Sequence, residues 1–118
     1  MLTVTNLSIH VKRTKETLVR SVSFSVENRE TLGLIGESGS GKSMTSKCIM
    51  RLLNPRLFDM RGSVQWNGKE MLAVKLSGLG GYRGKQISMI PQNPMTAFAP
   101  MLKLGKQMEL SFSLKDRR

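Results

Sequence analysis

The sequence predicts an α/β fold in which a small N-terminal antiparallel sheet is followed by the start of a parallel α/β core. Three observations predict it. Val22, Phe24 and Val26 alternate with serines, a pattern typical of a strand with one buried face. Residues 31–35 form a short, mostly apolar run that predicts a buried parallel strand. Residues 42–53 place apolar side chains at helical spacing, and a glycine-rich loop joins this helix to the strand before it.

Apolar and polar residues also alternate along the first eleven residues, but the phase of the alternation changes near Thr5-Asn6. This change predicts a bulge or short turn within an edge strand. Residues 12–17 are polar and predict a hairpin loop before the strand that ends at Val26. Gly62 to Trp66 predicts a further strand, and Asn67-Gly68 after it is the strongest hairpin signal in the chain. We therefore expect one antiparallel sheet built from these segments.

The remaining segments are less regular. Asn54-Pro55 is expected to end the helix, and residues 76–84 contain four glycines that predict a flexible connection. Residues 86–90 predict a strand, which the prolines of 91–94 break. Apolar residues recur at helical spacing over 104–112, although Gly105 weakens this prediction.

The glycine-rich loop fits the pattern G-x-x-x-x-G-K-[ST], which typifies loops that bind phosphate groups. Its glycines allow backbone conformations in which N–H groups point inward around an anion, and the following helix adds its unpaired N–H groups. The lysine is expected to reach the terminal phosphates, and the serine hydroxyl to complete a Mg²⁺ shell. The predicted phosphate-binding residues are Gly36, Glu37, Ser38, Gly39, Ser40, Gly41, Lys42 and Ser43.

Composition limits the remaining possibilities. The chain has 118 residues, enough for one modest core, and a net charge of +11. Such a charge suits nucleic acid, anionic lipid headgroups or polyphosphate ligands, or else reflects a missing acidic remainder. Lys12, Arg13 and Lys15 form one small basic group. Cys48 is the single cysteine, so no internal disulfide is possible, and its place on the apolar helix face predicts a packed thiol. No signal-peptide pattern and no membrane-spanning window is visible.

Taken together, these motifs resemble the N-terminal part of an ABC transporter nucleotide-binding subunit, in the group of importer ATPases for oligopeptides, dipeptides and nickel. Residues 32–43 are similar to that group's Walker A segment. Gly62-Ser63-Val64 with Asn67-Gly68 matches its antiparallel subdomain. Residues 87–100, Ile-Ser-Met-Ile-Pro-Gln-Asn-Pro-Met-Thr-Ala-Phe-Ala-Pro, are similar to its glutamine-loop segment and are the most specific of the three.

The resemblance implies an incomplete P-loop NTPase core, with residues 1–110 as the N-terminal part of the nucleotide-binding domain and 111–118 as a frayed tail. It implies ATP and Mg²⁺ as cofactors. Ser43 and Gln92 would contact the metal, with Gln92 also in reach of the attacking water, and the backbone N–H of Met44 would help bind the α-phosphate. The implied partners are transmembrane permease subunits and a second ATP-binding subunit. The implied location is cytoplasmic, peripheral on the inner face of the cell membrane.

The sequence also departs from this family. Members normally carry an aromatic residue that stacks on adenine in the loop near His10 to Lys15, where only His10 has a ring and Arg13 offers the other flat group. Arg29 stands where a turn glycine is usual, and Pro91 stands where an apolar residue is usual. The signature motif, the Walker B strand and the switch histidine are not found in these residues. We therefore expect nucleotide binding and no useful hydrolysis by this chain alone.

Two other functions would each explain part of the sequence. A small P-loop GTPase or kinase-like protein would explain the D-x-x-G pattern at 59–62, but no buried strand precedes it and no base-reading N-K-x-D segment exists. A basic nucleic-acid-binding module would explain the charge, but the aromatic residues are dispersed, so a nucleic-acid partner is not expected. The unfinished edge of the parallel core also predicts poor solubility or a molten state unless a partner covers it.

Overall fold

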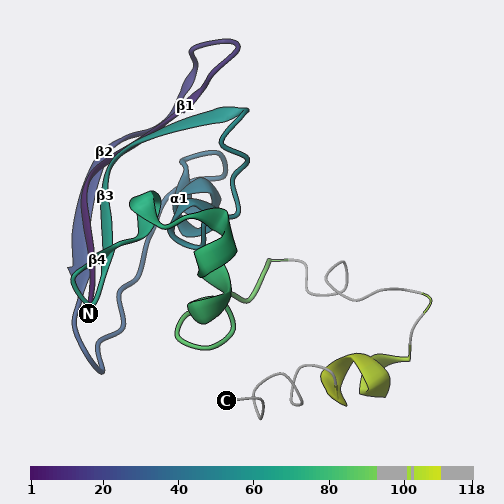
Figure 1. Ribbon diagram of the computed structural model, residues 1–118. Helices are drawn as coiled ribbons and strands as arrows, with labels where there is room; N and C mark the ends of the chain where they lie inside the picture. The colour runs from purple at the N-terminus through teal and green to yellow at the C-terminus, as the bar shows by residue number, and fades with distance from the viewer. Residues whose placement is uncertain (93–100, 102, 110–118) are drawn as a thin grey trace. The chain divides into compact units, whose positions relative to one another are not determined.

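The computed structural model describes residues 1–92, 101 and 103–109. The chain forms two compact units, residues 1–76 and residues 77–118, and each is described by itself. The first unit is a curved antiparallel sheet with a short helix packed on its concave side (Figure 1). Its elements are β1 (Leu2–Val11), β2 (Thr17–Val26), α1 (Lys42–Ile49), β3 (Phe58–Trp66), β4 (Lys69–Glu70) and the 3₁₀ turn η1 (Met71–Ala73).

The predicted antiparallel sheet is confirmed, with strand order β2-β1-β3-β4. One detail of the prediction is wrong, because β1 is a central strand and not an edge strand. It pairs with β2 on one side and with β3 on the other. Local alternation of apolar residues cannot reveal this, since it reports a buried face and not the number of neighbours. The Asn67-Gly68 turn between β3 and β4 is confirmed, with φ of 48° and 81°, both in the region that hairpin turns of this kind require.

The predicted bulge near Thr5-Asn6 is confirmed and crosses all three long strands. Asn6, Ser21 and Gly62 have φ of 48°, 45° and 105°, and the register shifts on both sides of β1 at this level. The Ser23 hydroxyl accepts a hydrogen bond from the Asn6 backbone N–H at 2.8 Å, so a side chain replaces a ladder bond. This line of bulges explains the strong bend of the sheet in Figure 1.

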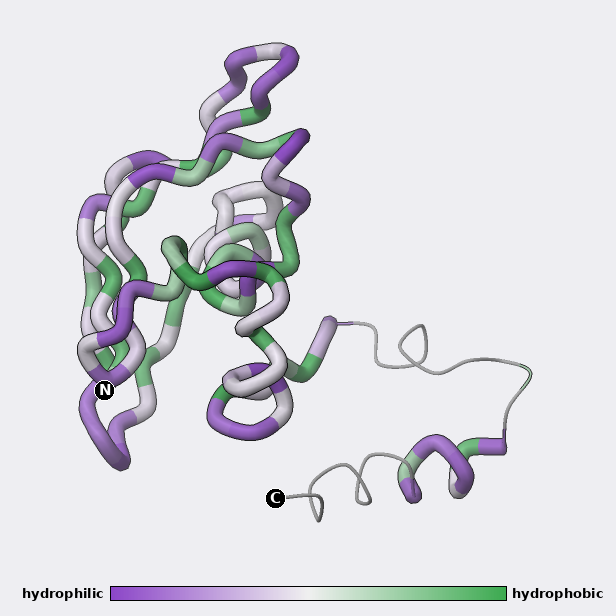
Figure 2. The backbone as a smooth tube through the Cα atoms, viewed as in Figure 1, coloured by the Kyte–Doolittle hydropathy of each residue, from purple (hydrophilic) through white to green (hydrophobic). Residues whose placement is uncertain are grey.

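The core of the first unit lies between the concave face of the sheet and α1. Figure 2 shows hydrophobic and hydrophilic residues mixed along the strands. The buried apolar side chains of this unit are Val4, Leu7, Ile9, Val19, Cys48, Leu53, Val64 and Met71. Strands β1, β2 and β3 therefore supply most of this core, and α1 contributes Cys48, as expected for a small two-layer unit.

Helix α1 ends at Ile49, four residues before the predicted end at Leu53. Arg51 takes a left-handed conformation with φ of 56°. The Leu52 N–H then bonds to the Lys47 carbonyl at 2.8 Å, and the Arg51 N–H bonds to the Cys48 carbonyl at 2.9 Å. This is the Schellman arrangement, which usually has glycine where Arg51 stands, so the sequence contains no signal for it.

The strand predicted over 31–35 is not present. These residues have no regular secondary structure and are exposed, with Ile35 fully so. A parallel strand forms only against a neighbouring strand, and no described strand pairs with this segment. The segment therefore has the apolar composition of a buried strand, but a strand conformation depends on hydrogen-bond partners that the described residues do not supply.

The second unit was also predicted only in part. Residues expected to be a flexible connection form the 3₁₀ helix η2 (Leu76–Gly81), in which Leu79 is buried. The strand predicted over 86–90 is absent, and a single parallel bridge joins Arg83 to Ile87 instead. Residues 104–109 are helical, as their apolar spacing predicts. Pro94 and the tail expected at residues 111–118 lie outside the described residues. The domain boundary expected at residue 110 stays a prediction.

Candidate functional site

The loop of residues 36–43, called the phosphate loop here, leads directly into α1. Its backbone turns twice through left-handed conformations, at Gly39 with φ of 82° and at Gly41 with φ of 95°. The Ser40 N–H donates to the Glu37 carbonyl at 3.1 Å and closes the turn between them. Gly41 is the N-cap residue of α1, and no acidic side chain occupies the helix's first turn. The positive end of the helix is therefore available to an anion.

Gly41 also fixes the loop against the sheet. A Cβ atom at this position would lie 2.8 Å from the Leu18 carbonyl oxygen and 2.9 Å from a methyl group of Val19, both on β2. Gly39 is different, because a Cβ atom there would meet nothing within 4 Å. The two glycines therefore share a backbone conformation, but only Gly41 is needed for close approach to another element.

The side chain of Lys42 turns back into the phosphate loop. Its ammonium group donates to the Gly36 carbonyl, to the Glu37 carbonyl at 2.8 Å and to the Ser40 hydroxyl at 3.2 Å. All three acceptors are neutral, so the positive charge of Lys42 is solvated by loop oxygens but not neutralised. A loop in this state can attract an anion.

Two further hydroxyl groups lie on the first turns of α1. Thr45 is buried and its hydroxyl donates to the Gly41 carbonyl at 2.8 Å, which holds the helix start in place. Ser43 is exposed, and its hydroxyl makes no hydrogen bond with any described residue. The Thr45 hydroxyl therefore stabilises the start of the helix, whereas the Ser43 hydroxyl remains able to ligate a cation.

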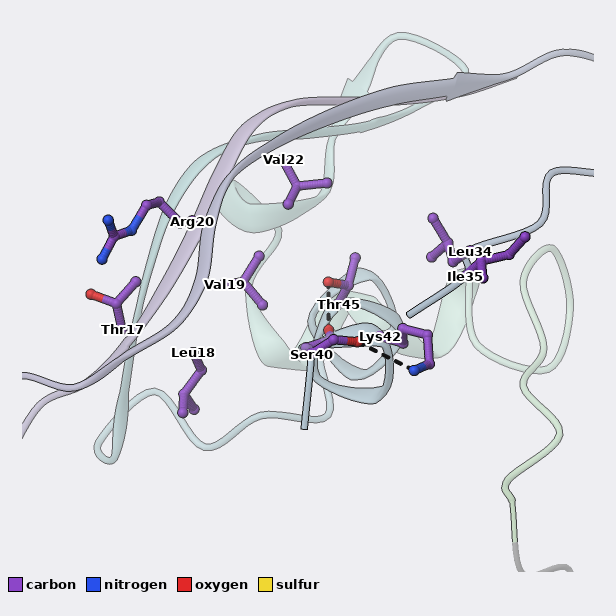
Figure 3. Close-up of a pocket in the computed structure, with 11 residues that line it drawn as sticks. Thr17, Leu18, Val19, Arg20, Val22, Leu34, Ile35, Ser40, Lys42 and Thr45 are labelled. Carbon is purple, nitrogen blue, oxygen red and sulfur yellow. Dashed lines mark hydrogen bonds between the residues drawn. The ribbon is translucent and has the colours of Figure 1, made fainter. Parts of the chain in front are cut away.

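A pocket of about 440 Å³ opens between the phosphate loop and β2. Figure 3 shows Val19 and Val22 pointing from β2 toward α1, with Lys42 on the far side of the helix start. Sequence reasoning missed the β2 wall, because the contact between β2 and the phosphate loop depends on tertiary packing and has no local signature. The residues that line the pocket are Thr17, Leu18, Val19, Arg20, Val22, Leu34, Ile35, Ser40, Gly41, Lys42 and Thr45.

The other candidate residues are not brought to this pocket's lining. Met44 lies on α1 and is half-buried. Gln92 is exposed and belongs to the second unit. His10 lies on β1, where its Nδ1 is 3.0 Å from the Thr17 hydroxyl, and Arg13 is exposed in the hairpin between β1 and β2. No described aromatic ring lines the pocket.

The titratable groups of the described residues give no sign of a catalytic centre. Burial raises the pKa of the Cys48 thiol to about 11, although the nearby Arg51 charge opposes the shift. The thiol is fully buried, which confirms the prediction of a packed cysteine and excludes a thiolate nucleophile at neutral pH. Asp59 pairs with Arg61 at 2.9 Å on the sheet surface. No cluster of three metal-binding acidic, histidine or cysteine side chains occurs among the described residues.

No helix within 1–92 or 103–109 is both long enough and apolar enough to cross a membrane.

Comparison with known proteins places this geometry in a family. The family model described as "ABC transporter" matches residues 19–117. A metal-staphylopine import system ATP-binding protein, CntD, of Staphylococcus aureus is 45% identical over 92% of this chain and 40% of its own length. The oligopeptide transport ATP-binding protein OppD of Bacillus subtilis is 43% identical over 75% of this chain and 25% of its own length. A putative peptide import ATP-binding protein of Brucella abortus is 39% identical over 92% of this chain and 33% of its own length.

The chain spans between a quarter and two fifths of the length of these relatives. The antiparallel sheet and the phosphate loop described above therefore make up part of an ABC transporter ATPase domain, a P-loop NTPase fold. With the family model covering most of the chain and relatives this similar over nine tenths of it, the chain belongs to the ABC transporter family, among its ATP-binding subunits.

Proposed function

We propose that this chain binds ATP together with Mg²⁺ through the phosphate loop. The observation that supports this most strongly is the Lys42 ammonium group, which is held inside the loop by neutral oxygens and has no carboxylate partner among the described residues. Its charge is positioned where the terminal phosphates of a nucleotide would enter. Their oxygens would accept its hydrogen bonds in place of some of the loop's own acceptors.

The backbone supports the same function. Gly39 and Gly41 turn the loop into the start of α1, whose first N–H groups have no acidic side chain in the first turn and are suited to bind an anion. The backbone N–H of Met44 lies in the first turn of this helix, where an α-phosphate would bind. The pocket beside β2 would then receive the nucleoside part, with an apolar wall of Val19 and Val22 and no aromatic ring for stacking.

The metal fits the residues present on this side of the loop. When bound, Mg²⁺ supplies charge neutralisation of the β- and γ-phosphates. The exposed Ser43 hydroxyl has no hydrogen bond with described residues and is a suitable oxygen ligand. Gln92 carries an amide oxygen of the kind that ligates hard cations, and we propose it as a further ligand of this Mg²⁺.

For the whole protein, we propose the ATP-binding role of an importer for peptide-like or metal-chelate cargo. The relatives named above are ATP-binding proteins of metal-staphylopine, oligopeptide and peptide import. The proposed partners are permease subunits and a second ATP-binding subunit, which would hold this chain at the inner face of the cell membrane. Hydrolysis is not proposed for these residues alone, because phosphoryl transfer also needs a positioned base and nucleophile.

The test is ATP binding by the full chain, measured by calorimetry with and without Mg²⁺. Lys42→Ala is expected to weaken binding by about tenfold or more, since charge-assisted hydrogen bonds to phosphate contribute about 1.5–3 kcal/mol. Lys47→Ala is the matched control, because Lys47 is an exposed lysine in the last turn of the same helix. Equal affinities for the two variants would refute the proposal.

Ser43→Ala separates the metal from the nucleotide. This variant is expected to bind ATP as the wild type does when Mg²⁺ is chelated, but to lose the gain in affinity that Mg²⁺ provides. Retention of the full Mg²⁺ effect would place the metal on other ligands. Hydrolysis that survives purification and is lost in Lys42→Ala would contradict the expectation of a non-hydrolysing chain.

A further inference from the structure

A second hollow lies at the tip of the sheet, where the hairpin between β1 and β2 meets the start of β3. Its volume is about 220 Å³, and its lining consists of His10, Val11, Lys12, Lys15, Asp59 and Arg61. Figure 2 shows this hairpin as a strongly hydrophilic segment of the first unit. The function proposed for the phosphate loop uses none of these residues.

The strand residues His10, Asp59 and Arg61 of this lining lie on the face of the sheet that is turned away from α1. Ile9 is fully buried on the side of α1, and successive residues of a strand point to opposite faces, so His10 points outward. Asp59 is directly opposite His10 in the β1–β3 pair and therefore shares its face. The two hollows have no lining residue in common, although Thr17, whose hydroxyl contacts His10, belongs to the lining of the pocket beside the phosphate loop.

Backbone hydrogen bonds hold the hairpin in shape. The Val11 N–H donates to the Glu16 carbonyl and the Lys15 N–H donates to the Val11 carbonyl, both at 2.8 Å. The Lys12 N–H donates to the Leu57 carbonyl at 2.9 Å and ties the hairpin to the residue before β3. Lys15 adopts a left-handed conformation, with φ of 62°. The lysines are therefore presented by a pre-formed loop, which lowers the entropy lost when a ligand binds.

The charges around the hollow are unbalanced. Three cationic side chains face one carboxylate, that of Asp59, which accepts a hydrogen bond from Arg61 Nε at 2.9 Å. The Lys12 and Lys15 ammonium groups are exposed and make no hydrogen bond with described residues. The Thr17 hydroxyl occupies only Nδ1 of His10, so Nε2 is left for another partner. Like charges that converge on a concave site repel one another unless an anion joins them.

We propose that this hollow is a second phosphate-binding site, which takes the phosphate group of a small monoester, either a soluble one or a phospholipid headgroup. The Lys12 and Lys15 ammonium groups supply the main attraction, and the terminal nitrogens of Arg61 add a planar donor pair. The volume accommodates a phosphate group with a short substituent and is half that of the pocket beside the phosphate loop. The site also gives a use to Lys12 and Lys15, which do not line the pocket beside the phosphate loop.

His10 makes the site measurable, because it is the only histidine of the sequence and its ring signals in an NMR spectrum need no further assignment. Inorganic phosphate and glycerol phosphate, titrated into the full chain at constant pH, are expected to shift these signals to saturation. The double variant K12Q/K15Q is expected to weaken this binding by about tenfold, as two partly exposed ion pairs are lost. The control K69Q/K75Q removes the same charge from exposed lysines elsewhere and is expected to bind as the wild type does.

The variant Lys42→Ala distinguishes binding at this hollow from binding at the phosphate loop. In this variant the His10 signals are expected to shift and saturate with phosphate as they do in the wild type. Sedimentation with phosphatidylcholine vesicles, with or without phosphatidic acid, then distinguishes the sources of the phosphate. Binding to the acidic vesicles that K12Q/K15Q abolishes identifies a headgroup, whereas soluble esters that shift His10 without vesicle binding identify a metabolite. The proposal is overturned if His10 does not respond, if K12Q/K15Q and K69Q/K75Q behave alike, or if only an oligonucleotide produces the shift.

Discussion

Replacing Gly41 by alanine tests whether close packing of the phosphate loop on β2 shapes the nucleotide site. Gly41 has φ of 95°, which costs a residue with a side chain about 1–2 kcal/mol. The new Cβ atom would also lie 2.8 Å from the Leu18 carbonyl oxygen, a backbone atom that cannot rotate away. Overpacking of this kind costs about 1–3 kcal/mol, so the total is about 2–5 kcal/mol. That is a large part of the roughly 5–15 kcal/mol by which a domain is stable.

Gly39→Ala is the matched control. Gly39 lies in the same loop with φ of 82°, but its added Cβ atom would meet nothing within 4 Å. This variant is expected to lose only the conformational cost of about 1–2 kcal/mol. Gly41→Ala should therefore be less stable than Gly39→Ala by about 1–3 kcal/mol, and should bind ATP more weakly because the loop must move away from β2.

Stability is measured by urea unfolding, followed by the fluorescence of Trp66, the single tryptophan of the sequence. ATP affinity is measured by calorimetry on the same samples. Equal losses in the two variants would refute the reasoning, because they would show that the contact with Leu18 has no energetic weight. A broad, non-cooperative unfolding curve for the wild type would instead bear out the molten state expected from the sequence.

Three further predictions concern other residues. Burial raises the pKa of Glu70, but hydrogen bonds from Ser63 and from the N–H groups of Val64 and Leu72 outweigh it, so the pKa lies below the ordinary 4.5. Glu70→Gln should therefore lower the free energy of unfolding by about 1–2 kcal/mol at neutral pH. Urea unfolding should show this difference from the wild type disappear as the pH falls below the pKa of Glu70 in the folded chain, because the wild-type carboxylate is then protonated. Arg29→Gly should be more stable than Arg29→Ala by about 1 kcal/mol, because Arg29 has φ of 63° and both variants lose the same charge; equal melting temperatures would contradict this. Cys48 should react with a thiol reagent only at the rate of unfolding, and fast labelling of the native chain would disprove its burial.

Several features could be predicted from the sequence because neighbouring residues determine them. The turn at Asn67-Gly68 needs two residues that tolerate positive φ, and both have it. Val22, Phe24 and Val26 alternate with serines, and these serines are exposed whereas the three apolar residues are half-buried. The glycine spacing of the phosphate loop gives its left-handed turns directly, and the same motifs identified the family that the comparisons then confirmed.

Other features depended on contacts between distant segments. Residues 31–35 have the composition of a buried strand but remain exposed, because a strand exists only when another strand accepts its hydrogen bonds. The end of α1 depends on Arg51, whose side chain donates to the Met71 carbonyl at 2.6 Å and to the Val74 carbonyl at 3.0 Å. Those acceptors are twenty or more residues away, so no local pattern indicates that a left-handed arginine would be stabilised there.

The candidate site also has one part that local sequence determines and one part that depends on tertiary contacts. The sequence alone determined the phosphate loop, since the flexibility of glycine, the charge of Lys42 and the N-terminus of a helix are properties of eight consecutive residues. Only the tertiary structure decided what surrounds that loop. It set β2 against Gly41, and it gathered Lys12, Lys15 and Arg61 around one hollow at the tip of the sheet. Strand register and the direction in which each side chain points are fixed by pairing across the sheet, which couples residues that are far apart along the chain.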